Sequence, residues 1–203
     1  MKLYRPATIL VGVLFVLLGG VTRLAAPDQV YEEQNIKIVH GTIGEPLDYT
    51  GSGSTVQITR MKFAQSVIDA SDADDEDEKP LETNGIYVAL EWDTVRGTKK
   101  PDNVNASLLA DGGSVYAPIS GVTSSSLDFA DAGFAKTGAI VFEVNPADLT
   151  NLTLRLHPTM LFNVYNSDIQ VDLGIPTEEI AQKMVDDAAP QYVVPRPVTR
   201  VAS

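Results

Sequence analysis

The chain has 203 residues, of which 27 are acidic and 15 basic, and the resulting net charge is −12. A surface of this charge repels nucleic acid and anionic lipid headgroups, so nucleic acid is excluded as the expected partner. The chain contains no cysteine, so no disulfide contributes to its stability, which must come from core packing.

The first feature along the chain is an apolar segment near the N-terminus. Residues 7–22 carry no charge, Lys2 and Arg5 precede them, and Arg23 follows. A segment of this length and polarity is typical of a transmembrane helix or of a secretion signal. Because basic residues flank its N-terminal end, the positive-inside rule predicts a cytoplasmic N-terminus at residues 1–6 and an extracytoplasmic C-terminus.

The flanks of this segment favour an uncleaved signal anchor over a cleaved signal peptide. Signal peptidase requires small residues at the first and third positions before the cleaved bond. A cut after Ala26 would place Leu24 at the third position and Pro27 directly after the bond. We therefore expect residues 7–24 to span the bilayer of the cell membrane once, with removal of the segment as the alternative.

The exported part is predicted to fold into a mainly β structure. Residues 25–34 have the composition of a short polar stalk, and residues 35–175 contain eight or nine short segments with alternating apolar side chains. Such spacing is typical of an antiparallel β-sandwich. The clearest predicted strands are residues 35–40, 55–63, 85–94, 138–145, 152–157, 161–165 and 169–173.

The sequence also predicts one hairpin turn and one core residue of the sandwich. Asp111 and the two glycines that follow it predict a hairpin turn between short strands. In the segment 85–94, Ile86, Val88, Leu90 and Trp92 share one face, so Trp92 is expected to anchor the core.

An acidic segment offers the one candidate cation site. Residues 69–78 include seven carboxylates, and Asp72, Asp74, Asp75 and Asp77 are the candidate Ca²⁺ ligands. The segment lacks the glycine and glutamate spacing of an EF-hand loop. A solvated loop is therefore the preferred interpretation, and no metal or cofactor is expected.

The sequence gives no sign of an active site. His40 and His157 are the only histidines, and no pattern places a nucleophile or a carboxylate beside either ring. Asp168 and Asp172 alternate along one predicted strand and are expected to face solvent together. An enzyme is therefore not expected, and a hydrolase with an unrecognised site is the least favoured alternative.

The C-terminal region contains the candidate partner-binding residues. Residues 176–190 begin with a proline and an acidic turn and predict a short helix, and residues 191–203 predict an extended tail. Tyr192, Val194, Arg196 and Arg200 are the candidates, because an extended tail can add a strand to a partner. The alternatives are a frayed tail and a tail that packs back on its own acidic domain.

Three stretches carry a family resemblance: GIYVALEW at residues 85–92, the phenylalanine and valine at 142 and 144, and LTLRL at 152–156. With the apolar N-terminal segment, this pattern resembles the telokin-like, immunoglobulin-like membrane-anchored envelope proteins of actinobacteria and other Gram-positive bacteria, over residues 55–173. The resemblance implies an immunoglobulin-like sandwich that acts as a binding or accessory module, and it implies no site residues. A disulfide-bearing immunoglobulin domain is excluded, because no cysteine pair surrounds Trp92.

The sequence thus predicts a membrane-anchored accessory or adaptor protein. It would bind another membrane or envelope protein, as a subunit of a cell-envelope or transport complex. The alternative function is an envelope domain that binds a cation or ligand through residues 69–78.

Overall fold

The computed structural model describes residues 37–49, 51–75, 77–99, 101, 103–120, 122, 126–159 and 167–202. The predicted cytoplasmic segment 1–6, anchor 7–24 and stalk 25–34 lie outside these ranges, as does the strand predicted at 161–165. Within these ranges, no helix has the length and apolar character that a membrane crossing requires.

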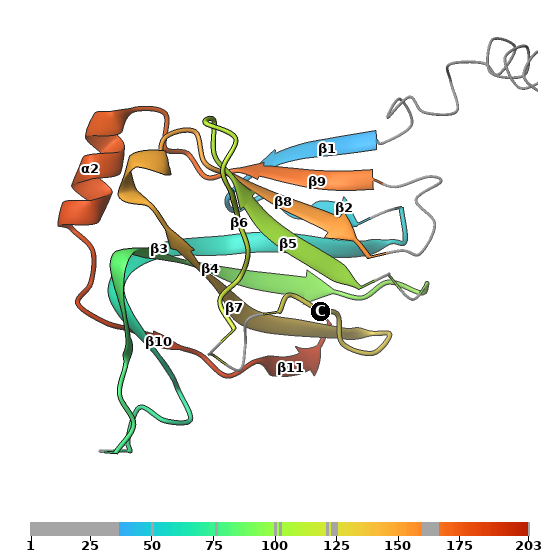
Figure 1. Cartoon of the computed structure of the whole chain (residues 1–203). Helices are drawn as coiled ribbons and strands as arrows, with labels where there is room; N and C mark the ends of the chain where they lie inside the picture. Colours follow the sequence, from blue (N-terminus) through green and yellow to red (C-terminus); the bar gives the residue numbers. More distant parts are fainter. Residues whose placement is uncertain are drawn as a thin grey trace, which may run out of the picture. The chain divides into compact units, whose positions relative to one another are not determined.

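The described residues form two β-sheets that enclose one main core (Figure 1). The first sheet has the strand order β1-β9-β8-β5-β6, and the second has the order β10-β3-β4-β7-β11, with β2 also paired to β3. The strands of the first sheet are β1 (Lys37–Thr42), β5 (Val104–Leu109), β6 (Val115–Tyr116), β8 (Thr153–Pro158) and β9 (Ser167–Asp172). Those of the second are β2 (Leu47–Tyr49), β3 (Ser54–Asp69), β4 (Leu81–Val95), β7 (Phe134–Val144), β10 (Tyr192–Val194) and β11 (Val198–Val201).

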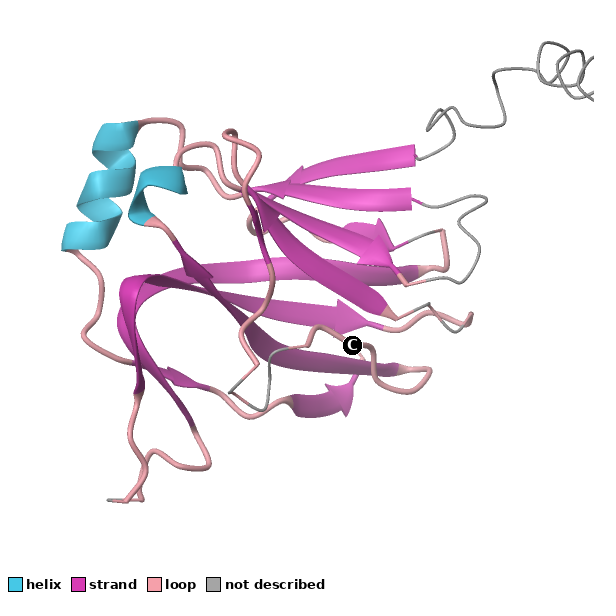
Figure 2. Cartoon of the chain, in the orientation of Figure 1, coloured by secondary structure: helices cyan, strands magenta, loops and turns pink. Residues whose placement is uncertain are grey.

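Helical structure is a minor part of the fold, as Figure 2 shows. The 3₁₀ helix η2 (Pro146–Asp148) follows β7, and the α-helix α2 (Glu178–Asp186) follows β9. Thr177 caps α2, because its hydroxyl oxygen accepts a hydrogen bond from the backbone N–H of Ile180. The expected mainly β sandwich with one short α-helix near the C-terminus is therefore confirmed.

The sandwich is not purely antiparallel, contrary to the prediction. β1 pairs with β9 in parallel, and β10 pairs with β3 in parallel, whereas the other paired strands are antiparallel. The sequence pattern carries no information on strand direction, because side chains alternate with a period of two in both kinds of sheet. Both parallel pairs join segments that are far apart along the chain.

The C-terminal residues 191–202 belong to the sandwich and do not form a separate tail. β10 lies beside β3 at one edge of the second sheet, and β11 lies beside β7 at the other edge. The last residues of the chain therefore run from one edge of this sheet to the other (Figure 1). Of the alternatives that the sequence left open, the structure adopts the one in which the tail packs back on its own domain.

The main core contains the apolar side chains that the alternating patterns place inward. Trp92 is fully buried at its centre, as predicted. The predicted inward residues of β4, β7 and β8 are all buried in this core: Ile86, Val88, Leu90, Ile140, Phe142, Val144, Leu154 and Leu156.

Trp92 determines which residue stands opposite it on β7. The register pairs Trp92 with Gly138, and a Cβ atom added to Gly138 would lie 2.5 Å from Cζ2 of the indole ring. Such a distance is far below an ordinary van der Waals contact, so the indole occupies the space that any other side chain at position 138 would need. The glycine is required here because a neighbouring ring fills this volume.

A second, smaller apolar cluster lies on the outer face of the same sheet. Tyr87 and Ala89, the residues that the alternation places opposite the core, are also buried there, together with Ala139 and Val141 of β7. Val122 and Val194 of β10 belong to the same cluster. The second sheet is thus apolar on both faces over this region.

We expect Gly138→Ala to destabilise the fold by about 1–3 kcal/mol, because the new methyl group overlaps the Trp92 indole and the core must shift. Urea unfolding measures this change in the free energy of unfolding. Gly112→Ala is the matched control, since an added Cβ there meets no atom within 4 Å. An equal effect at both positions would contradict the assigned packing.

Candidate functional site

The outermost strand β11 forms one edge of the second sheet. β11 pairs with β7 on one side, and among the described residues no strand pairs with its other side. All four of its residues are exposed, with Val198 57% and Val201 73% accessible to solvent. An exposed edge strand without a lysine or a proline within it is a ready template for a further strand.

The hydrogen-bond pattern identifies the backbone groups on this free edge. The backbone N–H of Ala202 donates to the carbonyl of Gly133, which therefore faces β11. The next carbonyl, that of Phe134, faces the other way and accepts a hydrogen bond from the backbone N–H of Arg96. Because backbone groups alternate in direction along a strand, Arg200 and Ala202 bond towards β7. The N–H and C=O groups of Thr199 and Val201 therefore point away from β7, towards solvent.

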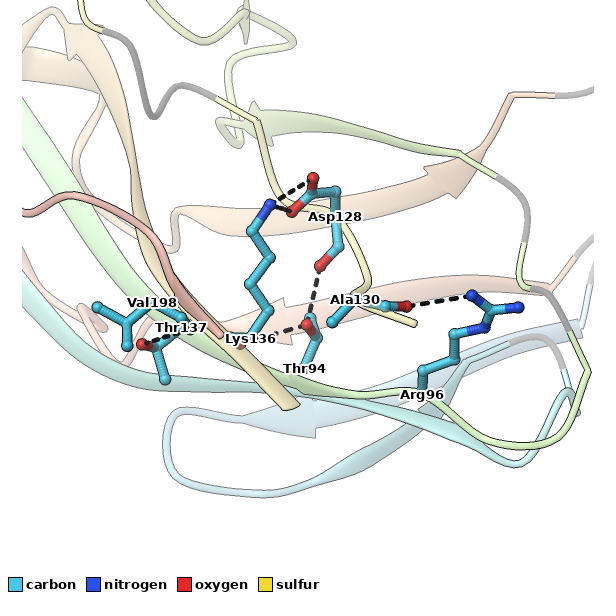
Figure 3. A network of polar contacts seen from close by, with 7 residues as sticks. All are labelled: Thr94, Arg96, Asp128, Ala130, Lys136, Thr137 and Val198. Atoms are coloured by element: carbon cyan, nitrogen blue, oxygen red, sulfur yellow. Dashed lines mark hydrogen bonds and ion pairs between the residues drawn. The ribbon is translucent and has the colours of Figure 1, made fainter. Parts of the chain in front are cut away.

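A loop at residues 126–131 lies next to this edge and is held by three side chains (Figure 3). The buried hydroxyl of Thr94 donates to the carbonyl of Asp128 at 2.8 Å. Lys136 Nζ lies 2.7 Å from the Asp128 carboxylate, and Arg96 Nη1 donates to the carbonyl of Ala130 at 3.3 Å. Thr94 and Lys136 lie near the ends of β4 and β7, and Arg96 directly follows β4, so the sheet itself positions the loop.

Two depressions flank this loop. One, of about 300 Å³, lies between the loop and the edge strands, and its lining includes Phe134, Lys136 and Thr199. The other, of about 330 Å³, lies on the Arg96 side and includes Asn103 and Val104. We term β11, Phe134 and the loop 126–131 together the strand-edge surface. It combines a free strand edge, exposed apolar side chains and a tethered loop.

The four predicted partner-binding residues do not form one exposed site. Val194 is fully buried in its own domain and is not available to a partner, which corrects the prediction for this residue. The hydroxyl of Tyr192 donates to Glu91 at 3.2 Å, and burial, with the Glu91 charge as the next cause, raises its pKa. Arg200 pairs with Asp93, and Arg196 is exposed.

The acidic segment begins inside the fold. Asp69 is a buried residue of β3, and its carboxylate accepts hydrogen bonds from the backbone and side chain of Ser71. In the turns that follow, Asp75 accepts a hydrogen bond from the backbone N–H of Asp77. Among the described residues, no three His, Cys, Asp or Glu side chains gather as metal ligands would. The candidate ligands Asp72, Asp74, Asp75 and Asp77 are all described residues, and they form no such group with other described side chains.

The first sheet carries a polar cluster that the sequence analysis did not anticipate. Asp168 is 2% exposed, so the expectation that it faces solvent together with Asp172 is wrong. Its carboxylate lies 2.6 Å from Nη2 of Arg155 and 3.4 Å from Nδ1 of His157, both on the neighbouring strand β8. A carboxylate therefore does lie beside the ring of His157, contrary to the expectation from the sequence. These contacts join the adjacent strands β8 and β9. The other histidine, His40, is exposed on β1.

The strand-edge surface was missed because its sequence signal is weak. Residues 198–201 read VTRV, a β-branched run that predicts a strand but does not identify which strand it will join. The loop 126–131 has no motif of its own. Its tethers Thr94, Arg96 and Lys136 come from distant positions in the chain, so only the folded sheet brings them together.

The comparisons with known proteins do not assign the chain to a family. No family model matches the chain, and neither does any curated protein. The chain is similar to a crystal structure described as an uncharacterized beta-sandwich protein from Clostridium difficile 630. That similarity has 13% sequence identity and a TM-score of 0.42, and it covers 70% of this chain and 97% of the other.

Replacing Asp168 with alanine is expected to cost about 2 kcal/mol or more, because the buried carboxylate accepts charged hydrogen bonds that tie β8 to β9. Thermal or urea unfolding provides the measurement. Asp172→Ala on the same strand removes an exposed carboxylate and is expected to cost less than half as much. A loss at position 168 no greater than the loss at position 172 would contradict the stabilising role assigned to the Asp168 contacts.

Thr94→Val tests the tether of the loop 126–131. The change keeps the shape of the side chain but removes the hydroxyl donor, which leaves the Asp128 carbonyl without its 2.8 Å bond. We expect a loss of about 1–2 kcal/mol and faster amide hydrogen exchange in the loop. Unchanged exchange there would mean that Thr94 does not hold the loop.

Proposed function

We propose that this protein is a membrane-anchored, extracytoplasmic accessory protein that binds another protein by accepting an extended segment along β11. Its function in this proposal is binding and not catalysis, with a membrane or envelope protein as the partner. The observation that carries the proposal is the free edge of β11, where the backbone groups of Thr199 and Val201 point to solvent.

Strand addition suits this edge for physical reasons. Backbone hydrogen bonds along the edge supply affinity, and alternate side chains of the added segment supply specificity. The depression between the loop 126–131 and β11 is lined by Thr199 of that strand, and Phe134 offers an apolar contact there. Because Thr94, Arg96 and Lys136 already hold the loop, binding loses little conformational entropy by ordering it.

Charge favours a different protein as the partner over a second copy. Each copy of this chain carries a net charge of −12, so two copies repel one another. Arg196, two residues before the start of β11, is exposed and forms no ion pair within the described part of the chain. An acidic residue flanking the partner segment would complement this arginine.

The proposed location and domain class come from the sequence. The uncharged segment at residues 7–22 supports insertion of residues 7–24 as a single-pass anchor, with the sandwich outside the membrane. The resemblance over residues 55–173 supports placing the sandwich among the immunoglobulin-like envelope domains, and the two packed sheets with Trp92 in the core are compatible with this class.

The variant Thr199→Pro tests the proposed binding edge. Proline removes the N–H that points to solvent, while the bonds of Arg200 and Ala202 to β7 remain. We expect the amount of partner that co-purifies with the full chain from membranes in mild detergent to fall at least tenfold, as quantified by mass spectrometry.

Thr199→Val is the control, because it retains the backbone donor and the β-branched side chain. It should co-purify the partner at the wild-type level, and both variants should unfold at similar temperatures. Recovery of the wild-type chain as a lone monomer, or undiminished partner with Thr199→Pro, would contradict the proposed function.

A further inference from the structure

A second surface lies at the opposite edge of the same sheet, between α2 and β3. β2 pairs with the beginning of β3 and β10 with its end, and α2 is packed beside the part of β3 between them. A groove of about 560 Å³ remains between the helix and the strand. Its lining comes from β3, from α2 and from the residues that directly follow α2.

The floor of this groove is apolar and incompletely covered. α2 buries only Ala181 completely, and Ile180 is 37% exposed although it belongs to the apolar side of the helix. Four large apolar side chains line the groove, together with Ala189: Met61, Phe63, Ile180 and Met184. Methionine side chains are flexible and polarizable, and surfaces rich in them adapt to the apolar face of a bound helix.

The rim of the groove is basic, in contrast to the chain as a whole. Lys62 and Lys183 are both exposed and line it, with Asp187 as the one acidic residue. Neither lysine forms an ion pair within the described residues. By contrast, five arginine and lysine residues elsewhere each pair with a carboxylate, namely Arg60, Arg96, Lys136, Arg155 and Arg200.

From the apolar floor and the two unpaired lysines, we propose that this groove binds an acidic amphipathic helix of a partner protein. Apolar side chains of that helix, spaced i, i+3, i+4 and i+7, would rest on Met61, Phe63, Ile180 and Met184. Its carboxylates would face Lys62 and Lys183. The inference rests on the proposed function, because it adds a second contact surface and a partner chemistry to the same binding protein.

The two lysines select an acidic partner through charge complementarity. Most of this acidic protein repels an acidic segment at long range, so a local basic rim restricts where such a segment can bind. The attraction between exposed charges is screened by salt, so binding should weaken as ionic strength rises.

The test uses a synthetic helical peptide of about 14 residues, or four turns, with leucines at the i, i+3, i+4 and i+7 positions and glutamates between them. Its fluorescence anisotropy is measured against the full chain in nanodiscs of zwitterionic lipid, with empty nanodiscs subtracted. We expect saturable binding in the micromolar range that weakens with salt. A peptide with lysine in place of every glutamate should bind at least tenfold more weakly.

Matched charge reversals assign the binding to the groove. The double variant Lys62→Glu/Lys183→Glu should weaken binding of the acidic peptide at least tenfold. Lys79→Glu/Lys99→Glu changes the net charge equally at exposed lysines that do not line the groove, and it should bind as the wild type does. A third variant, Met184→Gln, should weaken binding through the apolar floor without a change in charge.

Several results would overturn the proposal: no saturable binding, equal binding of the two peptides, or equal effects of the two double variants. A dimer that dissociates in Lys62→Glu/Lys183→Glu would assign the groove to a second copy. Binding of the chain to anionic phospholipid vesicles with no peptide binding would assign it to a membrane surface. Thr199→Pro changes the β11 edge and leaves the groove intact. If the wild-type chain binds no peptide but Thr199→Pro still lowers the amount of co-purified partner, the groove proposal alone is rejected.

Discussion

The pairing of Trp92 with Gly138 fixes how β4 and β7 lie against one another, and the rest of the second sheet depends on this pairing. The indole fills the space opposite the glycine, so neither strand can slip by one residue without driving a side chain into the ring. Two residues further along, the same register brings Thr94 opposite Lys136. These two residues hold the loop 126–131, so the packing of the core determines the position of an exposed loop.

The second sheet connects this core to the two proposed binding surfaces. Its central strands are buried on both faces, in the main core and in the smaller outer cluster, which gives a rigid support. Its two edges are completed differently. At one edge β11 adds a short exposed strand, and at the other α2 lies beside β3 and leaves an apolar groove. A rigid centre with incomplete edges is the arrangement expected of a module that binds other chains.

Much of the fold follows from the sequence, because alternation along a strand reports which side chains face the core. It identified the inward faces of β4, β7 and β8, the role of Trp92 and the hairpin at Asp111. Alternation does not report strand direction, which is why the parallel pairs β1–β9 and β10–β3 were not foreseen. It also missed the outer cluster around Tyr87 and Ala89, since burial there depends on chain segments that return from distant positions.

The candidate site was much less predictable than the fold. The sequence predicts that Tyr192, Val194 and Arg200 are available to a partner, because they lie in an extended terminal segment, yet the chain uses all three residues in its own sheet. Asp168 was expected on the surface, but Arg155 and His157 of the adjacent strand lie against its carboxylate. In both cases the residue type was visible in the sequence, whereas its neighbours were set by the pairing of strands.

The central claim, that β11 presents an unpaired backbone edge, is tested most directly by amide hydrogen exchange measured residue by residue by NMR. The amides of Thr199 and Val201 should exchange rapidly, while those of Arg200 and Ala202, which bond towards β7, should be protected. Protection of Thr199 and Val201 in the isolated chain would show that the edge is already covered and would contradict this account.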